Sequence, residues 1–264
     1  MFEHILIGID GRRGGRDAIA LARRLAAPSA SFVLAHVDAG PVSWWDHLME
    51  EERVFDRSAS MLAAERERAK IPAAIICVEG ASPAHGLHDL AQERAADLIV
   101  VGSSRHALLG RVLLGDDARA SLDRAPCAVA IAPHGYADSS TPLHEIGLGY
   151  DGSPESERAL ATARELAGRA GAEIKALRVI TPANVREEDT GNANWSESVW
   201  RSQAEALSDF SRDLDLLIVG SRTHGSLGRV RHGSVPGYLL RHVMCPLLVV
   251  PRIAVSAGSA ARAA

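Results

Sequence analysis

The chain contains one glycine-rich stretch twice, and this repeat limits its possible folds more than any other feature. The first copy covers 102–115 and the second 220–233, an offset of 118 residues (220 − 102). Internal repetition on this scale predicts two structural units of similar fold. Residues shared by the two copies include Gly102, His106, Leu109, Gly110, Arg111, Val112 and Gly115, which correspond to Gly220, His224, Leu227, Gly228, Arg229, Val230 and Gly233.

Each glycine-rich stretch follows a short apolar run and leads towards a predicted helix. In the second copy the run is 216–219 and the helix is expected at 235–242, directly after Ser234. Such a stretch can hold a phosphate, because glycines let the backbone approach an anion and free N–H groups at a helix start point towards it. It lacks the lysine of a P-loop and is longer than the G-x-G-x-x-G loop. The glycines taken alone favour a simpler role, a sharp turn between strand and helix, and the sequence leaves this alternative open.

Both units alternate β-branched apolar runs with segments of helical spacing. This alternation predicts a mostly parallel sheet covered by helices on both faces. We therefore expect an α/β fold with two open, parallel five-stranded sheets flanked by helices. In the first unit the strands are expected at 5–9, 31–37, 73–78, 98–101 and 128–132, and the helices at 17–26, 45–70, 83–95 and 116–124. Small ligands bind such sheets beyond the carboxyl ends of the strands.

The second unit is shorter than the first. Asp10 corresponds to Asp151 with an offset of 141 (151 − 10), which falls to 118 by the glycine-rich stretch, so 23 residues (141 − 118) are missing. The loss lies between 179 and 203. We expect the second helix of this unit to be lost or reduced to a turn, with an edge strand at 198–200. The predicted division is a first domain at 1–133, a linker at 134–143, a second domain at 144–251 and a flexible tail at 252–264.

Composition narrows the classes of function. The 264 residues carry a net charge of −4, which argues against nucleic acid as the main partner. No apolar run approaches the length of a membrane span, and the start lacks the pattern of a signal peptide. Three cysteines lie in or beside apolar runs without a disulfide pattern. We expect a cytoplasmic protein with buried, reduced thiols.

With both units in view, the chain resembles the universal stress protein family in its tandem two-domain form. The resemblance rests on Asp151-Gly152-Ser153-Pro154, the segment 215–222, Gly233-Ser234 and the closing strand at 244–250. It implies a Rossmann-like, adenine nucleotide alpha hydrolase-like fold whose two units pair, often through their last strands. It also implies binding of ATP, with or without Mg²⁺. In the family the aspartate after the first strand contacts adenine, and the glycine loop with its Gly-Ser holds ribose and phosphates.

The resemblance carries over more completely to the second unit than to the first. The second unit has Thr223 where the family has a glycine, and Arg222 could pair with a phosphate or form a salt bridge. The expected nucleotide-binding residues are Gly149, Asp151, Gly152, Val179, Gly220, Arg222, Thr223, Gly233, Ser234 and Val235. Their degenerate equivalents in the first unit are Asp10, Val37, Gly102, Arg105, Gly115 and Asp116.

Asp116 stands where the second unit has Ser234. A carboxylate about 4 Å from a phosphate costs about 4 kcal/mol at an effective dielectric constant of about 20. Asp116 is also a good helix N-cap, which is a sufficient structural role for it. We therefore expect one competent nucleotide site, in the second unit.

The expected function is a stress-response regulator that binds adenine nucleotide and acts by a change of conformation or partner. We assign no catalytic and no metal-binding residue. A ligand-free interaction protein and a slow adenine-nucleotide hydrolase are the alternatives. The two units are expected to pair within the chain as a pseudo-dimer, and a homodimer of such chains is also compatible with the sequence.

Overall fold

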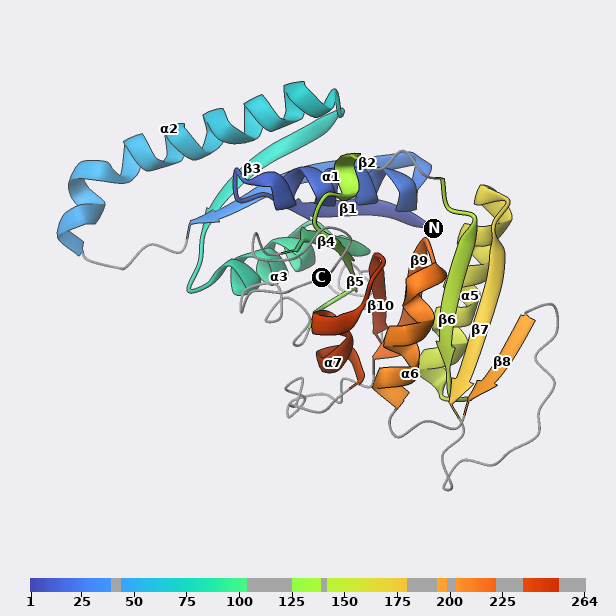
Figure 1. Cartoon of the computed structure of the whole chain (residues 1–264). Coiled ribbons are helices and arrows are strands. Elements are labelled where there is room, and N and C mark those ends of the chain that lie inside the picture. Colours follow the sequence, from blue (N-terminus) through green and yellow to red (C-terminus); the bar gives the residue numbers. More distant parts are fainter. Residues whose placement is uncertain are drawn as a thin grey trace, which may run out of the picture.

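The computed structural model describes residues 1–38, 44–103, 125–138, 142–179, 194–198, 203–221 and 235–251. Ten strands form one continuous sheet in the order β3-β2-β1-β4-β5-β10-β9-β6-β7-β8 (Figure 1). The strands of the first half are β1 (Phe2–Gly8), β2 (Ala26–Asp38), β3 (Ala73–Glu79), β4 (Leu98–Gly102) and β5 (Ala128–Ala132). Those of the second half are β6 (Glu145–Tyr150), β7 (Glu173–Val179), β8 (Asn194–Ser198), β9 (Leu216–Ser221) and β10 (Leu247–Pro251).

The two units meet at the middle of the sheet through their last strands. Neighbouring strands are parallel within each unit, whereas β5 and β10 pair antiparallel, with Leu248 opposite Ala130. The expected α/β class with five parallel strands per unit is confirmed, and so is the pairing through the last strands. The sequence predicted two separate five-stranded sheets, whereas in the structure the two are joined at their edges into one sheet. The predicted domain limits at 133, 143 and 251 stay a prediction.

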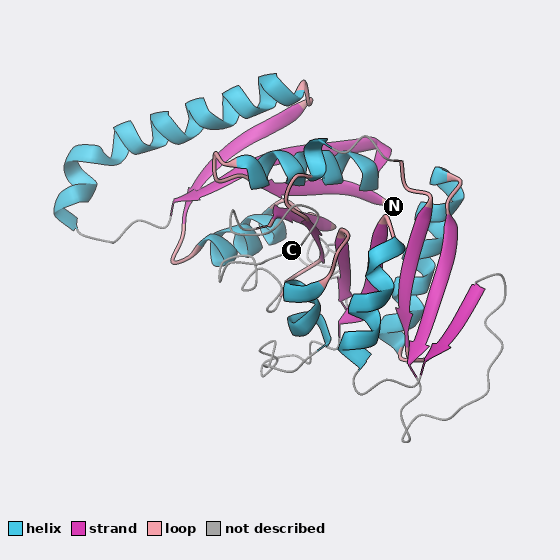
Figure 2. Cartoon of the chain, in the orientation of Figure 1, coloured by secondary structure: helices cyan, strands magenta, loops and turns pink. Residues whose placement is uncertain are grey.

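Helices cover both faces of the sheet (Figure 2). One face carries α1 (Arg13–Leu25), α2 (Trp44–Ala69) and α5 (Pro154–Ala170), whose apolar side chains form one core with the sheet. The other face carries α3 (Pro83–Glu93), α6 (Gln203–Phe210) and α7 (Val235–His242) over a second core. Every residue of β5 is buried. An apolar run without alternation suits such a strand, because one of its faces lies in the first core and the other in the second.

The shortened part of the second unit keeps an edge strand. β8 pairs with β7 in parallel, with Ser196 opposite Leu177. An edge strand is thus present at Asn194–Ser198, and it shares only Ser198 with the strand expected at 198–200. Residues 180–193, where the loss of a helix was expected, lie outside the described residues, as do 199 and 200. The helix predicted at 116–124 and the tail at 252–264 also lie outside them.

Two of the three cysteines are buried in the second core, as expected. Cys127 precedes β5 and Cys245 precedes β10, at equivalent positions of the two units, while Cys77 is half-buried in β3. Burial raises the pKa of the Cys127 thiol to about 12 and also raises the pKa of Cys245. Both thiols are thus held neutral in the folded chain.

These thiols predict a loss of stability at high pH. The unfolded chain releases the two protons near the ordinary thiol pKa, whereas the folded chain retains them, so unfolding becomes more favourable as pH rises. The stabilisation is fully present below pH 8 and decreases from about pH 9 towards 12, by about 1.4 kcal/mol per pH unit for each thiol. Urea unfolding between pH 7 and 11 measures this slope. A Cys127→Ala, Cys245→Ala double variant should show a clearly smaller slope, and an unchanged slope would contradict the assignment.

Candidate functional site

Those predicted site residues that the structure describes lie at the carboxyl edge of each unit. In the first unit this edge is formed by the ends of β1, β2 and β4, and in the second by those of β6, β7 and β9. Because β5 and β10 are antiparallel, the carboxyl edges of the two units point in opposite directions along the sheet. Each unit thus has its own carboxyl edge, which is where small ligands bind in parallel α/β sheets.

The aspartate after the first strand forms the same turn in both units. Asp10 Oδ1 accepts a hydrogen bond from the Arg12 backbone N–H at 2.9 Å, and Asp151 Oδ1 accepts one from the Ser153 N–H at 3.0 Å. The glycine between them has a positive φ in each case, 73° at Gly11 and 76° at Gly152. The repeated sequence therefore builds the same local geometry, and this turn holds each aspartate at the end of a buried strand.

The helices that follow these turns begin differently. Ser153 caps α5, since its side chain accepts the Ser156 N–H at 3.2 Å. This is a structural role, in line with the absence of a nucleophile motif around it. Helix α1 has Arg12 at its N-cap without a side-chain cap, and Gly14 and Gly15 lie in its first turn. Open backbone N–H groups at a helix start favour a negatively charged ligand.

A cavity of about 320 Å³ lies at the carboxyl edge of the first unit. Its wall combines apolar side chains with a few polar ones, which is typical of a small-molecule site. Three residues predicted for this unit, Asp10, Val37 and Gly102, lie in the wall together, whereas Arg105, Gly115 and Asp116 lie outside the described residues. The lining residues are Gly8, Ile9, Asp10, Arg12, Gly14, Gly15, Ala35, His36, Val37, Pro83, Leu87, Val101, Gly102 and Ser103.

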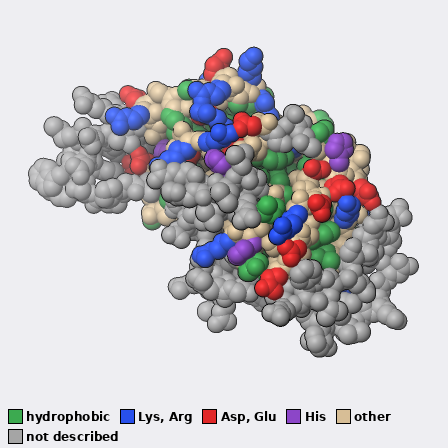
Figure 3. Space-filling model, in the orientation of Figure 1, with side chains coloured by type: hydrophobic (Ala, Val, Ile, Leu, Met, Phe, Trp, Pro, Cys, Tyr) green, Lys and Arg blue, Asp and Glu red, His purple; other side chains and the backbone are tan. Residues whose placement is uncertain are grey.

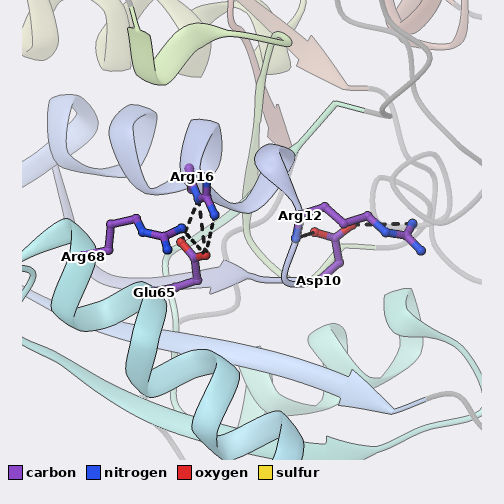
Figure 4. A network of polar contacts seen from close by, with 5 residues as sticks. All are labelled: Asp10, Arg12, Arg16, Glu65 and Arg68. Atoms are coloured by element: carbon purple, nitrogen blue, oxygen red, sulfur yellow. Dashed lines mark hydrogen bonds and ion pairs between the residues drawn. The ribbon is translucent and has the colours of Figure 1, made fainter.

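The charged groups near this cavity come from neighbouring elements (Figure 4). Arg12 Nη1 lies 3.9 Å from Asp10 Oδ2, and the Asp10 side chain is 55% exposed, so this pair is weak. Behind it, Arg16 of α1 donates from Nε and Nη2 to Glu65 of α2, which also binds Arg68 at 3.2 Å. The Glu65 side chain is only 8% exposed. This network fixes α1 against α2 beside the cavity.

His36 was missed by the sequence reasoning. Its Nδ1 donates to the Ile9 carbonyl oxygen at 2.7 Å, and its side chain lines the cavity. Since a carbonyl only accepts, Nδ1 carries a proton and Nε2 is the remaining nitrogen for a ligand. A polar residue near the end of an otherwise apolar strand was the available signal. By strand register the equivalent position in the second unit is Arg178, which follows Leu177 opposite Gly149.

A glycine at or next to the end of the fourth strand of each unit contacts a helix. A Cβ on Gly102 would lie 2.0 Å from the Gly14 carbonyl oxygen, and a Cβ on Gly220 would lie 2.6 Å from the Glu155 carbonyl carbon. Gly14 and Glu155 occupy equivalent positions in α1 and α5. Both glycines are therefore required by the close approach of strand and helix. This agrees with the structural alternative that the sequence left open.

The structure describes only some of the residues that were predicted for the nucleotide site of the second unit. Gly149 lies in β6 opposite Val219, Gly220 lies in β9, and Asp151 and Gly152 form the turn after β6. Val179 ends β7 and Val235 begins α7, at the same edge. Arg222, Thr223, Gly233 and Ser234 lie outside the described residues, as do His106 and His224.

The family model for the universal stress protein family matches residues 1–133, 142–211 and 209–251. The chain belongs to the universal stress protein family. The resemblance drawn from the sequence is thereby confirmed, including its tandem form, since the matches cover both units.

Relatives of this universal stress protein are found in several prokaryotes. A universal stress protein of Mycolicibacterium smegmatis is 28% identical over 293 residues, covering 93% of this chain and 96% of the relative. A universal stress protein of Archaeoglobus fulgidus has a solved structure with a TM-score of 0.72 at 16% identity, covering 95% and 98% of the two chains. A universal stress protein of Pseudomonas aeruginosa gives a TM-score of 0.65 at 16% identity, covering 95% and 93%. At these identities the solved structures confirm the fold.

Two further properties concern the described part of this universal stress protein. It contains no group of three or more His, Cys, Asp or Glu side chains placed to hold a metal ion. None of the helices in the described ranges is long and apolar enough to cross a membrane. On the face shown in Figure 3, acidic and basic side chains are interspersed, as the small net charge of −4 suggests.

Proposed function

We propose that this universal stress protein is a regulator that binds ATP, or another adenine nucleotide, in its second unit. The observation that carries the proposal is the aspartate turn that both units share at the carboxyl edge and that borders a cavity in the first unit. Because the Asp151 turn repeats that geometry, the second unit has the same starting point for a ligand site. One solved universal stress protein is a complex with cAMP.

The choice of the second unit rests on the residues expected around the phosphates. Ser234 offers a hydroxyl and a helix N-terminus, whereas its counterpart Asp116 would place a carboxylate near the phosphates. Arg178 takes the place of His36 in the strand register, so this position always carries a positive charge in the second unit. A permanent cation favours a polyanionic ligand. The proposed signal is a change in conformation or partner when the nucleotide is bound.

A ligand-free interaction protein is the second candidate, and one observation favours it. Gly102 and Gly220 are both explained by contact with a helix, without any ligand. In that case the repeat preserves a fold and not a phosphate site.

Variants of the two turn aspartates test the proposal. Asp151→Ala should weaken binding of a fluorescent ATP analogue about tenfold or more, since a charge-assisted hydrogen bond to the ligand is lost. Asp10→Ala is the matched control and should change affinity by less than about twofold. Asp151→Asn keeps an oxygen acceptor for the Ser153 N–H, so it separates loss of the turn from loss of the charge. A larger effect of Asp10→Ala would move the site to the first unit, and absence of binding to the unsubstituted protein would favour the ligand-free candidate.

A further inference from the structure

Helix α1 contacts the cavity with its first turn and the segment between the two units with one side. Gly14 and Gly15 lie in the cavity wall. The other contacts involve residues 134–138, which we call the linker segment, and which include the short 3-10 helix η1 (Tyr136–Asp138). Arg13, Asp17 and Arg24 are spaced by four and seven residues, so they lie along one stripe of the helix. All three bind the linker segment.

The central contact of this stripe is a buried carboxylate. Asp17 is fully buried, with no solvent-accessible surface. Its Oδ2 accepts the Gly135 N–H at 3.0 Å and its Oδ1 accepts the Ala137 N–H at 2.7 Å. Both oxygens of a buried charge are thus satisfied by the linker segment, which makes the contact costly to open. The equivalent position in α5 is the exposed Arg158 (offset 158 − 17 = 141), so this contact is not a general property of the repeat.

The same stripe is secured at both ends. At the start of the helix, Arg13 forms an ion pair with Asp138. At its end, the Arg24 guanidinium lies 5.7 Å from the centre of the Tyr136 ring, and the Arg24 carbonyl accepts a hydrogen bond from Arg169 of α5 at 3.2 Å. The bond from Arg169 therefore connects this side of α1 to the second unit.

The first turn of α1 has little freedom to move independently of the sheet. Gly14 of α1 and Gly102 of β4 are in close contact. A Cβ on Gly102 would lie 2.0 Å from the Gly14 carbonyl oxygen, and a Cβ on Gly14 would lie 2.9 Å from the Ser103 carbonyl oxygen. Arg16 is held to the buried Glu65 of α2 at 3.0 Å. A displacement at the cavity wall must therefore move the helix, and with it Asp17.

We propose that α1 couples the first-unit cavity to the linker segment, so that a change at either one alters how firmly the other is held. Coupling of this kind is reciprocal, because a single equilibrium connects the two places. It gives the degenerate first unit a regulatory role, since any ligand or contact at its cavity would affect the connection to the second unit. The coupling does not depend on the identity of that ligand, so its tests need none.

The first test starts at the linker contact. In Asp17→Asn one oxygen still accepts, while the amide NH₂ faces the other linker N–H as a second donor. Hydrogen exchange of the full chain should become about tenfold faster or more in the linker segment and also in residues 9–15 at the cavity. Exchange in α6, which lies on the opposite face of the sheet in the second unit and does not line the cavity, should stay unchanged. Asp89→Asn, on the exposed side of α3, is the matched control and should affect neither region.

The second test starts at the cavity. Gly14→Ala places a Cβ 2.9 Å from the Ser103 carbonyl oxygen and should speed exchange of the Gly135 and Ala137 amides severalfold. Gly168→Ala in α5 has no atom within 4 Å of the new Cβ and should leave them unchanged. The coupling is refuted if Asp17→Asn affects the linker segment without the cavity turn, or if Gly14→Ala leaves the linker amides unaltered. An equal increase in α6 would also refute it, because general destabilisation would then explain the result.

Discussion

Replacing Gly102 by alanine is expected to lower the free energy of unfolding by about 3 kcal/mol or more, since overpacking against rigid backbone is at the upper end of such effects. The new Cβ would lie 2.0 Å from the Gly14 carbonyl oxygen, so α1 would have to move away from β4. Gly220→Ala meets Glu155 backbone at 2.6 Å and should destabilise the second unit for the same reason. Urea unfolding followed by circular dichroism measures both losses.

Gly168→Ala is the control for this prediction. It lies in α5 with open space around it, so alanine should be neutral or should stabilise by about 0.5–1 kcal/mol through its higher helix propensity. If Gly102→Ala were as stable as the parent, the close contact between β4 and α1 would be wrong. The assignment of this glycine to strand–helix packing would then fail, and its interpretation as a phosphate-binding glycine would regain support.

A second large effect is expected at the junction of the two units. Leu248 of β10 is fully buried opposite Ala130 of β5, in the middle of the continuous sheet. Leu248→Ala should cost about 2–5 kcal/mol, which combines the lost apolar transfer energy with a cavity that rigid strands cannot fill. Because the sheet continues across the junction, urea unfolding should remain a single transition at lower urea concentration.

The edge strand β3 offers a comparison for this variant. Ile76 is only half-buried there, so Ile76→Ala should cost less than half as much as Leu248→Ala. Equal losses at the two positions would contradict the central place of β10. Two separate unfolding transitions in Leu248→Ala would show that the units are independent, contrary to the joined sheet.

Apolar runs predicted most of the fold, and the deviations have local causes. The strand at 128–132 was predicted with its observed limits, because five buried apolar residues leave no other interpretation. Helix α1 begins at Arg13, four residues before the predicted start, since the glycines and arginines there show no apolar spacing and their contacts are tertiary. The polar strand β8 is recognised only through its pairing with β7.

Site residues could be predicted where they directly follow a recognisable strand, because such residues lie at the carboxyl edge of the sheet. Asp10 and Asp151 each end an apolar run, so their place at the carboxyl edge could be predicted, and the structure gives them the same turn. The contact of Gly102 with Gly14 could not, because nothing in the sequence separates a glycine that admits a ligand from one that admits a helix. The hydrogen bonds from the linker segment to the buried Asp17 could not be predicted either, because they depend on the tertiary fold.

Calorimetric titration of the full chain with ATP and Mg²⁺, beside a Ser234→Asp variant, tests the central claim most directly. The proposed function predicts binding of about one ATP per chain and loss of that binding in the variant, where a carboxylate would repel the phosphates, as we propose for Asp116 in the first unit. Unchanged binding in Ser234→Asp would show that the second unit is not the site. No heat and no thermal shift at millimolar ATP would contradict nucleotide binding altogether, and the chain would then be an interaction protein built on a nucleotide-binding fold.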